Sequence, residues 1–400
     1  MNLLLLCNKV PYPPKDGGSI ATFNLARGFV LAGHKVSILA MNTPKHYIHP
    51  KHIPELILKE INISLVNVNT RIKLIYAVLN LIFSKLPYIA VRYHSGYFKK
   101  ALSDILEHNS FDIIQIESPY LGYYIPIIKK YSSAKISYRA HNVEHEIWNR
   151  IACQSIVFYK KIYLMNLAKR VKKLEINLLN KYDCILPITQ RDNKIFISLG
   201  NTKPSFVTPV GLDLSNLQPN QPDFTFPTLF YIGSLDWMPN QEGLRWFINE
   251  VWEQILIQYP LLEFHIAGRN APDNLIKLFN KKNITFFGEV DNSIDFINNR
   301  SVMIVPLFSG SGMRVKIVEG MALEKTIITT SIGTEGIETK NGENILIADT
   351  VEDFINAISI TIENKDTCST IGKNARAFIH QYYDNRKIAE DLIMFYKNLK

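Results

Sequence analysis

The sequence predicts an α/β protein built of two doubly wound, Rossmann-like domains that face each other across a cleft. Three observations predict this fold. Short apolar runs alternate with segments of helical spacing, which is typical of a parallel sheet covered by helices on both faces. The alternation occurs twice, with a polar, proline-bearing run between the halves. The length of 400 residues, 47% of them apolar, is enough for two cores.

The first half begins with an apolar run at 3–7, as expected of a strand that is buried on both faces. Helical spacing at 19–31 then predicts a helix that ends near Gly33. Further strands are expected at 35–40, 61–68, 112–116, 135–139 and 183–187. Helices are expected between them at 71–84, 94–108, 120–131 and 145–180.

The second half repeats this scheme. Strands are expected at 228–232, 263–267, 285–287, 301–307, 326–330 and 344–347. Helices are expected at 241–258, 272–281, 291–299, 312–323 and 351–362. The polar run at 218–223 is the best linker candidate, and we expect domains at 1–205 and 206–380. The segment 381–400 carries a last helix, whose docking partner the sequence does not reveal.

Composition and charge limit the class of protein. The four cysteines are far apart and match no metal-binding spacing, so we expect reduced thiols in a cytoplasmic protein. The start of the chain lacks the features of a secretory signal. The longest apolar stretch, 72–83, is well short of the roughly 20 residues of a spanning helix. The net charge of +9 indicates anionic partners.

In open α/β sheets, ligands bind beyond the carboxyl ends of the strands, and the candidate residues follow strands. The segment 309–336 begins with a glycine turn, Gly310 and Gly312, and continues with a helix that has Arg314 and Lys316 in its first turn. Cations there oppose the helix dipole unless they face a bound anion. Glu319 follows one turn later. The alternative is an ordinary Lys316–Glu319 helical ion pair on a face away from the packed stripe.

Other strand-end residues are weaker candidates. Gly17 and Gly18 can let a ligand approach the backbone at a helix start, or they can simply close a turn. His141 can donate to a sugar hydroxyl or carry a proton, or it can bond to local backbone. A metal site formed with His145 is disfavoured because no third ligand lies nearby.

Three loops of the second half add further candidates. Gly233 follows a strand, and Asn240 suits the N-cap of the helix at 241–258. Arg269, after a strand and a glycine, suits a diphosphate, but taken alone it is better explained as a solvated arginine. Gly288 and Val290 resemble a loop that contacts a flat ring through its backbone.

Two basic amphipathic stretches, 71–93 and 158–179, can lie on an anionic membrane surface or can be helices with a solvated basic face. No nucleic-acid motif is present, because the aromatic residues do not interleave with the basic ones.

Together these segments resemble a retaining glycosyltransferase of the GT-B fold, specifically glycosyltransferase family 4. The resemblance covers nearly the whole chain. The residues that carry it are the 309–336 segment, YIGSLDWMPN at 231–240, HIAGR at 265–269, TPVGLD at 208–213 and DGG at 16–18.

The resemblance implies that the second domain binds a nucleotide-diphosphate sugar and needs neither metal nor cofactor. Arg314 and Lys316, with Arg269, would hold the diphosphate, and Glu319 would accept from the ribose hydroxyls. His141 would contact the transferred sugar. The remaining implied substrate-binding residues are Gly17, Gly18, Gly233, Asn240, Gly288, Val290, Gly310, Ser311, Gly312 and Met313.

One position departs from the family pattern. The family commonly has Glu-x7-Glu, and the first Glu contacts the donor sugar. Ser311 stands at that position here, eight residues before Glu319.

The activity implied is transfer of a sugar to a hydroxyl of a glycan or lipid-linked acceptor in cell-surface polysaccharide or glycoconjugate synthesis. Peripheral attachment to the inner membrane face is a further expectation. The alternatives are a sugar-nucleotide epimerase or hydrolase of the same fold, and a basic membrane-binding or nucleic-acid-binding protein without activity.

Overall fold

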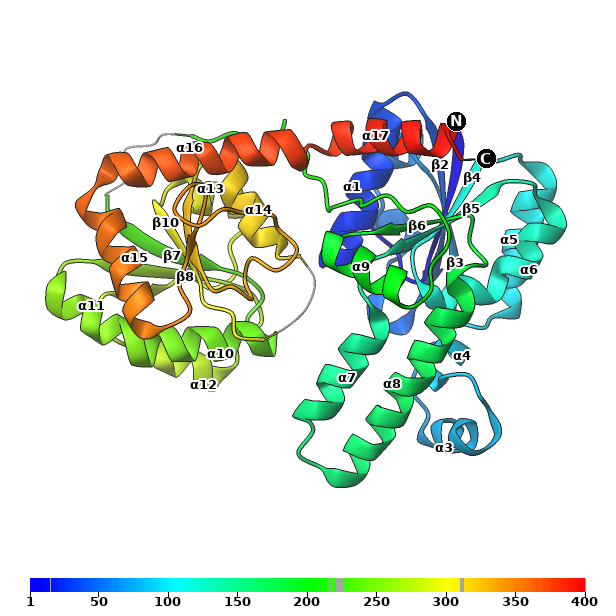
Figure 1. Cartoon of the computed structure of the whole chain (residues 1–400), viewed down its shortest axis with the longest axis horizontal. Helices are drawn as coiled ribbons and strands as arrows, with labels where there is room; N and C mark the ends of the chain where they lie inside the picture. Colours follow the sequence, from blue (N-terminus) through cyan, green and yellow to red (C-terminus); the bar gives the residue numbers. More distant parts are fainter. Residues whose placement is uncertain (15, 216, 221–225, 310–312, 400) are drawn as a thin grey trace. The chain divides into compact units, whose positions relative to one another are not determined.

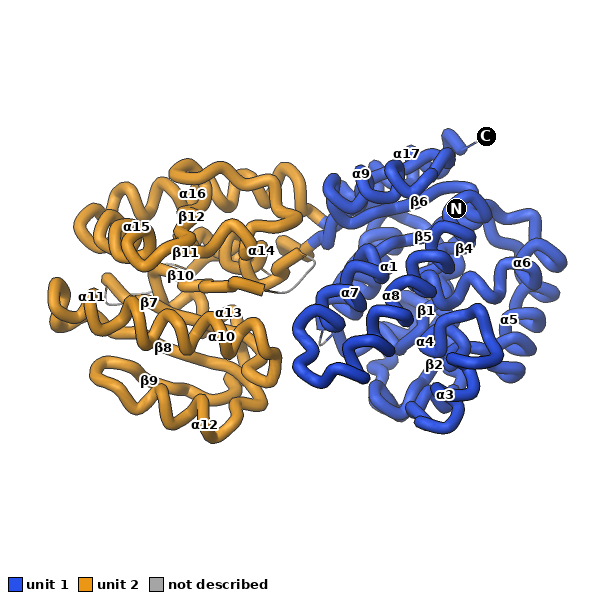
Figure 2. The backbone as a smooth tube through the Cα atoms, turned by 60° about the horizontal axis from the view of Figure 1, so that its bottom comes forward, with its two compact units in different colours: residues 1–211, 385–400 blue, residues 212–384 orange. Residues whose placement is uncertain are grey.

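The computed structural model describes residues 1–400 except 15, 216, 221–225, 310–312 and 400. The chain forms two compact units (Figures 1 and 2). Unit 1 comprises Met1–Gly211 and Asn385–Lys400, and unit 2 comprises Leu212–Asp384. The sequence places this division after residue 205, whereas the structure places it after Gly211 and returns the end of the chain to unit 1.

The described residues of unit 1 contain a six-stranded sheet with the order β3-β2-β1-β4-β5-β6. All of its neighbouring strands run parallel; Leu3 of β1, for example, pairs with Val36 of β2 and with Ile113 of β4. The strands are β1 Asn2–Cys7, β2 Lys35–Asn42, β3 Asn62–Asn67, β4 Ile113–Ile116, β5 Lys135–Ala140 and β6 Cys184–Pro187.

Helices cover both faces of this sheet, because alternate residues of the apolar strands point to opposite sides. Leu3 and Leu5 pack with residues of α1 and α17, and Leu4 and Leu6 pack with residues of α5 and α6. The helices are α1 Gly17–Leu31, α2 Glu55–Glu60, α3 Leu74–Phe83, α4 Tyr88–Val91, α5 Gly96–His108, α6 Ile125–Tyr131, α7 Glu144–Gln154, α8 Phe158–Leu179, α9 Gln190–Ser198 and α17 Asn385–Lys397.

Unit 2 repeats the architecture. The order of its sheet is β12-β11-β10-β7-β8-β9, and its neighbouring strands are parallel. The strands are β7 Thr228–Ile232, β8 Glu263–Ala267, β9 Ile284–Phe286, β10 Val302–Val305, β11 Thr326–Thr329 and β12 Leu346–Ile347. The helices are α10 Met238–Trp246, α11 Trp252–Gln258, α12 Asp273–Ile276, α13 Ser293–Asn298, α14 Val315–Ala322, α15 Val351–Glu363 and α16 Lys365–Tyr382.

All the expected strands are present with small shifts of their ends, but several helices differ from the prediction. The predicted helix at 145–180 is a hairpin of α7 and α8. The predicted helix at 241–258 is interrupted by a π-helical turn at Phe247–Val251, between α10 and α11. The sequence patterns do not predict α2, α4, α9 or α16. The last helix, α17, packs beside α1 in unit 1 (Figure 1).

Each sheet reverses its strand order at one point, and this point is where open α/β sheets bind ligands. In unit 1 it lies between β1 and β4, and in unit 2 between β7 and β10. In the part of the chain that the structure describes, no helix is both long and apolar enough to cross a membrane.

Candidate functional site

Lys316 is the centre of the candidate site in unit 2. It lies in the first turn of α14, which follows β10. Its Nζ donates to the hydroxyl of Tyr231 in β7 and to Oδ1 of Asn240 in α10, at 2.9 Å in both cases. The same Nζ lies 4.4 Å from the centroid of the Tyr231 ring. The ammonium group is therefore held across the point where the strand order reverses.

The alternative interpretation of Lys316, an ion pair with Glu319, is wrong for the described residues, because the hydrogen bonds of the lysine go to Tyr231 and Asn240. Arg314, the residue before the first turn of α14, is buried. It is 4% exposed, and its guanidinium carbon lies 5.6 Å from the centroid of the Trp237 ring.

Gly233, directly after β7, leaves room for this arrangement. A Cβ atom added there would lie 3.0 Å from the Tyr231 hydroxyl and 3.3 Å from Nζ of Lys316. Real side chains rarely pack so closely, so a larger residue would push against the lysine. The glycine is therefore part of the geometry that positions the cation.

Asn240 is not the N-cap that its position in the sequence suggests. Helix α10 begins at Met238, so Asn240 lies inside its first turn and is not an N-cap. Its side chain is 4% exposed. The amide accepts from Lys316 and donates to the carbonyl oxygen of Ser234 at 2.7 Å. It therefore ties the lysine to the loop after β7.

The loops after β7, β8 and β9 are joined to one another. Nε of Arg269 donates to Oγ of Ser234 at 3.2 Å, and the N–H of Leu235 donates to the carbonyl of Arg269 at 2.9 Å. The N–H of Gly268 donates to the carbonyl of Gly288 at 2.8 Å. Gly288 has a φ of +69°, a conformation that favours glycine. Val290 packs partly buried against the core of the unit.

The titration behaviour of Lys316 and Glu319 is unusual. Burial, with a further contribution from the charge of Arg314, lowers the pKa of Lys316 to about 7. Burial raises the pKa of Glu319 to about 7. An anion bound beside the lysine would favour its charged form and raise its pKa again. Groups perturbed in this way at a strand end are candidates for a functional site.

Part of the predicted site lies outside the described residues, namely Gly310, Ser311 and Gly312. Met313, the next residue, packs partly buried against the core of unit 2.

In unit 1, His141 lies directly after β5. Its Nε2 lies 2.7 Å from Oε2 of Glu117, which follows the neighbouring strand β4. Thr22 of α1 donates to the same carboxylate oxygen at 2.8 Å, and Gln115 donates to the other oxygen. Nδ1 of His141 is buried and has no hydrogen-bond partner among the described residues. The histidine is thus oriented by a carboxylate.

Glu117 is 5% exposed but stays ionised. Burial alone would raise its pKa, but the hydrogen bond and charge of His141, the charge of Arg139 and the Gln115 hydrogen bond outweigh burial and lower it.

Gly17 and Gly18 form the first turn of α1. The turn is capped by Asp16, which accepts from the N–H of Ser19 at 3.0 Å and from Lys9 at 2.5 Å. A Cβ atom added at Gly17 would meet nothing within 4 Å. At Gly18 it would lie 3.3 Å from Nζ of Lys9, so the backbone of this turn is open at Gly17 only.

His145 and His141 pair with different carboxylates. Its Nδ1 lies 2.7 Å from Oε2 of Glu175, whose oxygens also accept from the backbone N–H groups of Glu144 and His145. Among the described residues there is no cluster of three or more histidine, cysteine, aspartate or glutamate side chains that could hold a metal ion.

Comparison with known proteins decides the family. The model of "Glycosyltransferase Family 4" matches residues 15–216, half of the chain, and the model of "Glycosyl transferases group 1" matches residues 226–364.

The chain belongs to glycosyltransferase family 4.

Relatives of this glycosyltransferase extend over its whole length. An uncharacterized 44.6 kDa protein in the cps region of Klebsiella pneumoniae is 24% identical over 96% of this chain and 97% of the relative. Sucrose-phosphate synthase from Thermosynechococcus elongatus has a TM-score of 0.68 with 15% identity, covering 100% of this chain and 99% of that one. HepE of Anabaena, solved with UDP-glucose, has a TM-score of 0.66 with 13% identity, covering all of both chains. These likenesses confirm the predicted GT-B fold.

The structure of the glycosyltransferase adds residues that sequence reasoning missed. From the sequence, Tyr231 is expected only within a strand and within the 231–240 run, without a role of its own, and Glu117 is not singled out. The available signal for Glu117 was its position: it is a carboxylate directly after a buried strand, next to the strand that carries His141. In unit 2 the structure connects Gly233, Asn240 and Lys316 through their contacts.

Proposed function

We propose that the protein transfers a sugar, with retention of anomeric configuration, from a nucleotide-diphosphate sugar to a hydroxyl of a glycan or lipid-linked acceptor. The observation that carries the proposal is the Lys316 ammonium, held by Tyr231 and Asn240 at the carboxyl ends of β7 and β10. A positive group fixed at that point suits the diphosphate of a donor.

In this proposal, Lys316 and Arg314 hold the diphosphate with Arg269, and Glu319 accepts from the ribose hydroxyls. HepE, which shares the fold, was solved with UDP-glucose, and this supports a nucleotide-diphosphate sugar as the donor. Because these side chains supply positive charge directly, we propose that the donor is bound without a metal ion or other cofactor.

The reaction breaks the bond between the anomeric carbon and the diphosphate oxygen, and it forms a bond to the acceptor oxygen. Positive charge develops on the sugar ring, and negative charge develops on the leaving diphosphate. Fixed cations stabilise this negative charge more in the transition state than in the donor. The acceptor attacks the same face that the diphosphate leaves, and its proton passes to the departing diphosphate.

We propose that His141 forms a hydrogen bond with a hydroxyl of the transferred sugar. Glu117 fixes the ring of the histidine through Nε2, and a histidine oriented in this way suits hydrogen bonding to a neutral hydroxyl. Glu117 would then be a positioning residue that acts through His141.

We propose that the acceptor is an intermediate of cell-surface polysaccharide synthesis. The relative from Klebsiella pneumoniae is encoded in a cps region, which supports a role in cell-surface polysaccharide synthesis. A glycan or a lipid-linked intermediate offers the required hydroxyl.

A second candidate is a sugar-nucleotide epimerase or hydrolase. Such an activity needs an acid/base pair near the sugar, and the hydrogen-bonded Glu117–His141 pair has this chemistry. The two activities differ in what happens without an acceptor, because an epimerase or a hydrolase then still converts the donor.

The test is product analysis by NMR with a panel of nucleotide-diphosphate sugars, with and without glycan acceptors. Sugar transfer predicts a new glycosidic signal with the anomeric configuration of the donor, formed only with acceptor. An inverted product would contradict retention. A free or epimerised sugar nucleotide formed at the same rate without acceptor would favour the second candidate.

A further inference from the structure

Helix α3 of unit 1 directs apolar side chains into solvent along its whole length. Leu74, Ile75 and Phe83 are 79%, 74% and 81% exposed, and Ala77 is the single buried residue of the helix. A surface helix normally turns its apolar side chains toward the core. Large contiguous apolar patches on a protein surface mark sites that contact another protein or a membrane.

The turn between α7 and α8 adds to this apolar surface. Ile156, Phe158 and Tyr159 are 99%, 76% and 79% exposed. Helix α8 is tied to α3, since Arg170 donates to the carbonyl oxygens of Asn80 and Leu81 at 3.1 and 2.7 Å. The turn and α3 project from the same side of unit 1 (Figure 1).

Both segments are basic and contain no acidic residue. Residues 61–103 include no Asp or Glu, and neither do residues 156–174. Their cations are Arg71, Lys73, Lys85, Arg92, Lys99 and Lys100 in the first stretch and Lys160, Lys161, Lys169, Arg170, Lys172 and Lys173 in the second. Apolar side chains mixed with cations and free of acidic groups suit the surface of an anionic bilayer. An ordinary protein partner would not require such a one-sided charge.

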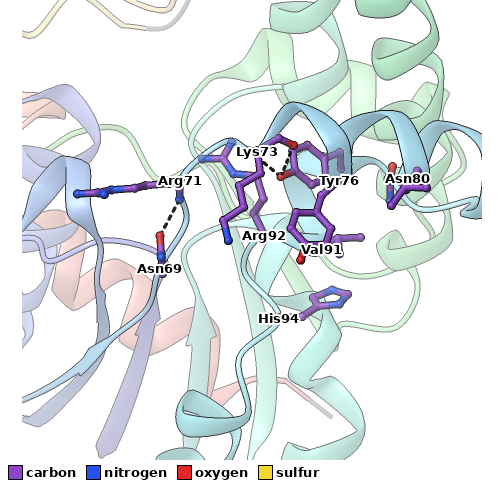
Figure 3. A pocket seen from close by; sticks show the side chains of 10 residues that line it. Asn69, Arg71, Lys73, Tyr76, Asn80, Val91, Arg92 and His94 are labelled. Carbon is purple, nitrogen blue, oxygen red and sulfur yellow. Dashed lines mark hydrogen bonds between the residues drawn. The ribbon is translucent and has the colours of Figure 1, made fainter.

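A pocket of about 560 Å³ lies beside α3, and Arg71, Lys73 and Arg92 are among the side chains that line it (Figure 3). Arg71 and Lys73 form no ion pair with any of the described residues. Nε and Nη2 of Arg92 both donate to the carbonyl of Thr70, the former at 2.7 Å. The hydroxyl of Tyr88 contacts the backbone of Lys73 at 3.1 and 3.2 Å and so fixes the segment that leads into α3. The pocket thus offers cations without carboxylates, which suits a phosphate group.

We propose that α3, the α7–α8 turn and this pocket form one docking surface for an anionic phospholipid bilayer. The apolar side chains of α3 enter the boundary between headgroups and acyl chains. Headgroup phosphates lie against Lys73 and Arg92 and against Arg71, whose side chain extends in another direction (Figure 3). The surface belongs to unit 1, and its action does not depend on the proposed sugar transfer.

The test is co-sedimentation of the full-length protein with vesicles of phosphatidylcholine containing about 30 mol % phosphatidylglycerol, compared with phosphatidylcholine alone. The protein is expected to bind the anionic vesicles, and the binding should weaken as salt is raised. Protein that stays in the supernatant with the anionic vesicles at low salt would overturn the proposal.

The contribution of the cations to vesicle binding is tested with the double variant Arg71→Gln, Lys73→Gln. Each cation lost near an anionic surface should weaken vesicle binding about fivefold. The matched control is Lys129→Gln, Lys130→Gln on α6, which removes two exposed charges elsewhere on unit 1. Equal effects of the two double variants would show that net charge alone drives binding, and the pocket assignment would be wrong. Binding of inorganic phosphate without binding to vesicles would also contradict it.

The contribution of the apolar side chains of α3 to vesicle binding is tested with the double variant Ile75→Ser, Phe83→Ser. Both side chains are exposed, so the fold should be unaffected, while vesicle binding should fall at least tenfold. The control is Ile257→Ser, Leu261→Ser in unit 2, where the side chains are 81% and 92% exposed. Unchanged vesicle binding of the α3 variant would overturn the proposal. So would a dimer in solution that becomes a monomer in this variant, because the face would then join two copies of the chain.

Discussion

At the residue scale, the candidate site in unit 2 depends on the amine of Lys316, which gains or loses its charge near neutral pH. Lys316 is buried between Tyr231 and Asn240, and its pKa is lowered to about 7 by burial first and by Arg314 second. Glu319, on the same helix, has a pKa raised to about 7 by burial. The proposed diphosphate needs the lysine charged, and the proposed ribose contact needs the glutamate ionised.

This arrangement predicts a bell-shaped pH dependence of nucleotide affinity with its maximum near neutral pH. Above pH 7 Lys316 loses its proton and its attraction for the diphosphate. Below pH 7 Glu319 gains a proton and accepts ribose hydroxyls less well. Calorimetric titration with a nucleotide diphosphate between pH 5.5 and pH 9, roughly the interval around these pKa values, measures the profile.

Two variants separate the limbs of this profile. Lys316→Arg keeps the charge at all these pH values and should remove the alkaline limb. Glu319→Gln should remove the acidic limb. An affinity that does not vary with pH in the wild type would contradict the assigned roles.

In unit 1, Glu117→Gln is expected to lower kcat about a hundredfold while leaving the donor KM nearly unchanged. The change removes the carboxylate that orients His141 but retains the volume of the side chain. The measurement is steady-state kinetics with a pH profile, because a purely structural role would not move the profile. The control is Glu146→Gln, whose carboxylate pairs with Arg191 at 2.7 Å on the surface of the same unit. A parallel loss of stability and activity in the Glu117 variant alone would contradict a positioning role.

At the element scale, the loop after β7 must pass close to α14. The Gly233→Ala variant is expected to displace Lys316 and to weaken nucleotide binding by about 1 kcal/mol or more, since an added Cβ would lie 3.3 Å from Nζ. Gly96→Ala is the matched control, because a Cβ added there meets nothing within 4 Å. The measurement is the nucleotide affinity of both variants by titration, together with their melting temperatures. Equal affinity in both would show that Gly233 has no part in the site.

The elements themselves were largely predictable. Continuous apolar runs identified the strands, because buried parallel strands carry apolar residues on both faces. Helix ends were less predictable. The π-helical turn at Phe247–Val251 and the break between α7 and α8 contain no proline or glycine that would predict them from the sequence. Tertiary packing determines both.

The candidate site was predictable only where its residues have a local signature. Lys316 stood out because a cation at a helix start is unfavourable without an anion. The capping role expected of Asn240 is wrong, since a capping residue and a residue that bonds a neighbouring side chain look alike in sequence. Glu117 has no motif, and its role depends on Thr22 and His141, which are distant in the sequence.

At the scale of the whole molecule, the chain returns to unit 1 after completing unit 2. Helix α17 packs against the sheet and α1 through Ala389, Leu392 and Ile393. Its Tyr396 hydroxyl donates to Oε1 of Gln115 at 2.7 Å, and Gln115 donates to Glu117. The last helix therefore supports both the core of unit 1 and the carboxylate behind His141.

We expect Leu392→Ala to lower the free energy of unfolding of unit 1 by about 2–5 kcal/mol, because the side chain is fully buried. Met394→Ala on the same helix is the control, since Met394 is 56% exposed and should change little. Urea unfolding followed with a probe in each unit measures the effect. An equal loss in both variants would contradict the assignment of α17 to the core of unit 1.

The central claim is that unit 2 binds a nucleotide-diphosphate sugar through Lys316. The most direct measurement is calorimetric titration of the protein, its Lys316→Met variant and a Lys340→Met control with a panel of such donors. We predict that at least one donor binds, and that Lys316→Met weakens it about 10- to 100-fold, as expected for loss of a charge-assisted hydrogen bond. Lys340 is exposed and should have no effect. No binding of any donor, or equal binding by Lys316→Met and the wild type, would contradict the claim.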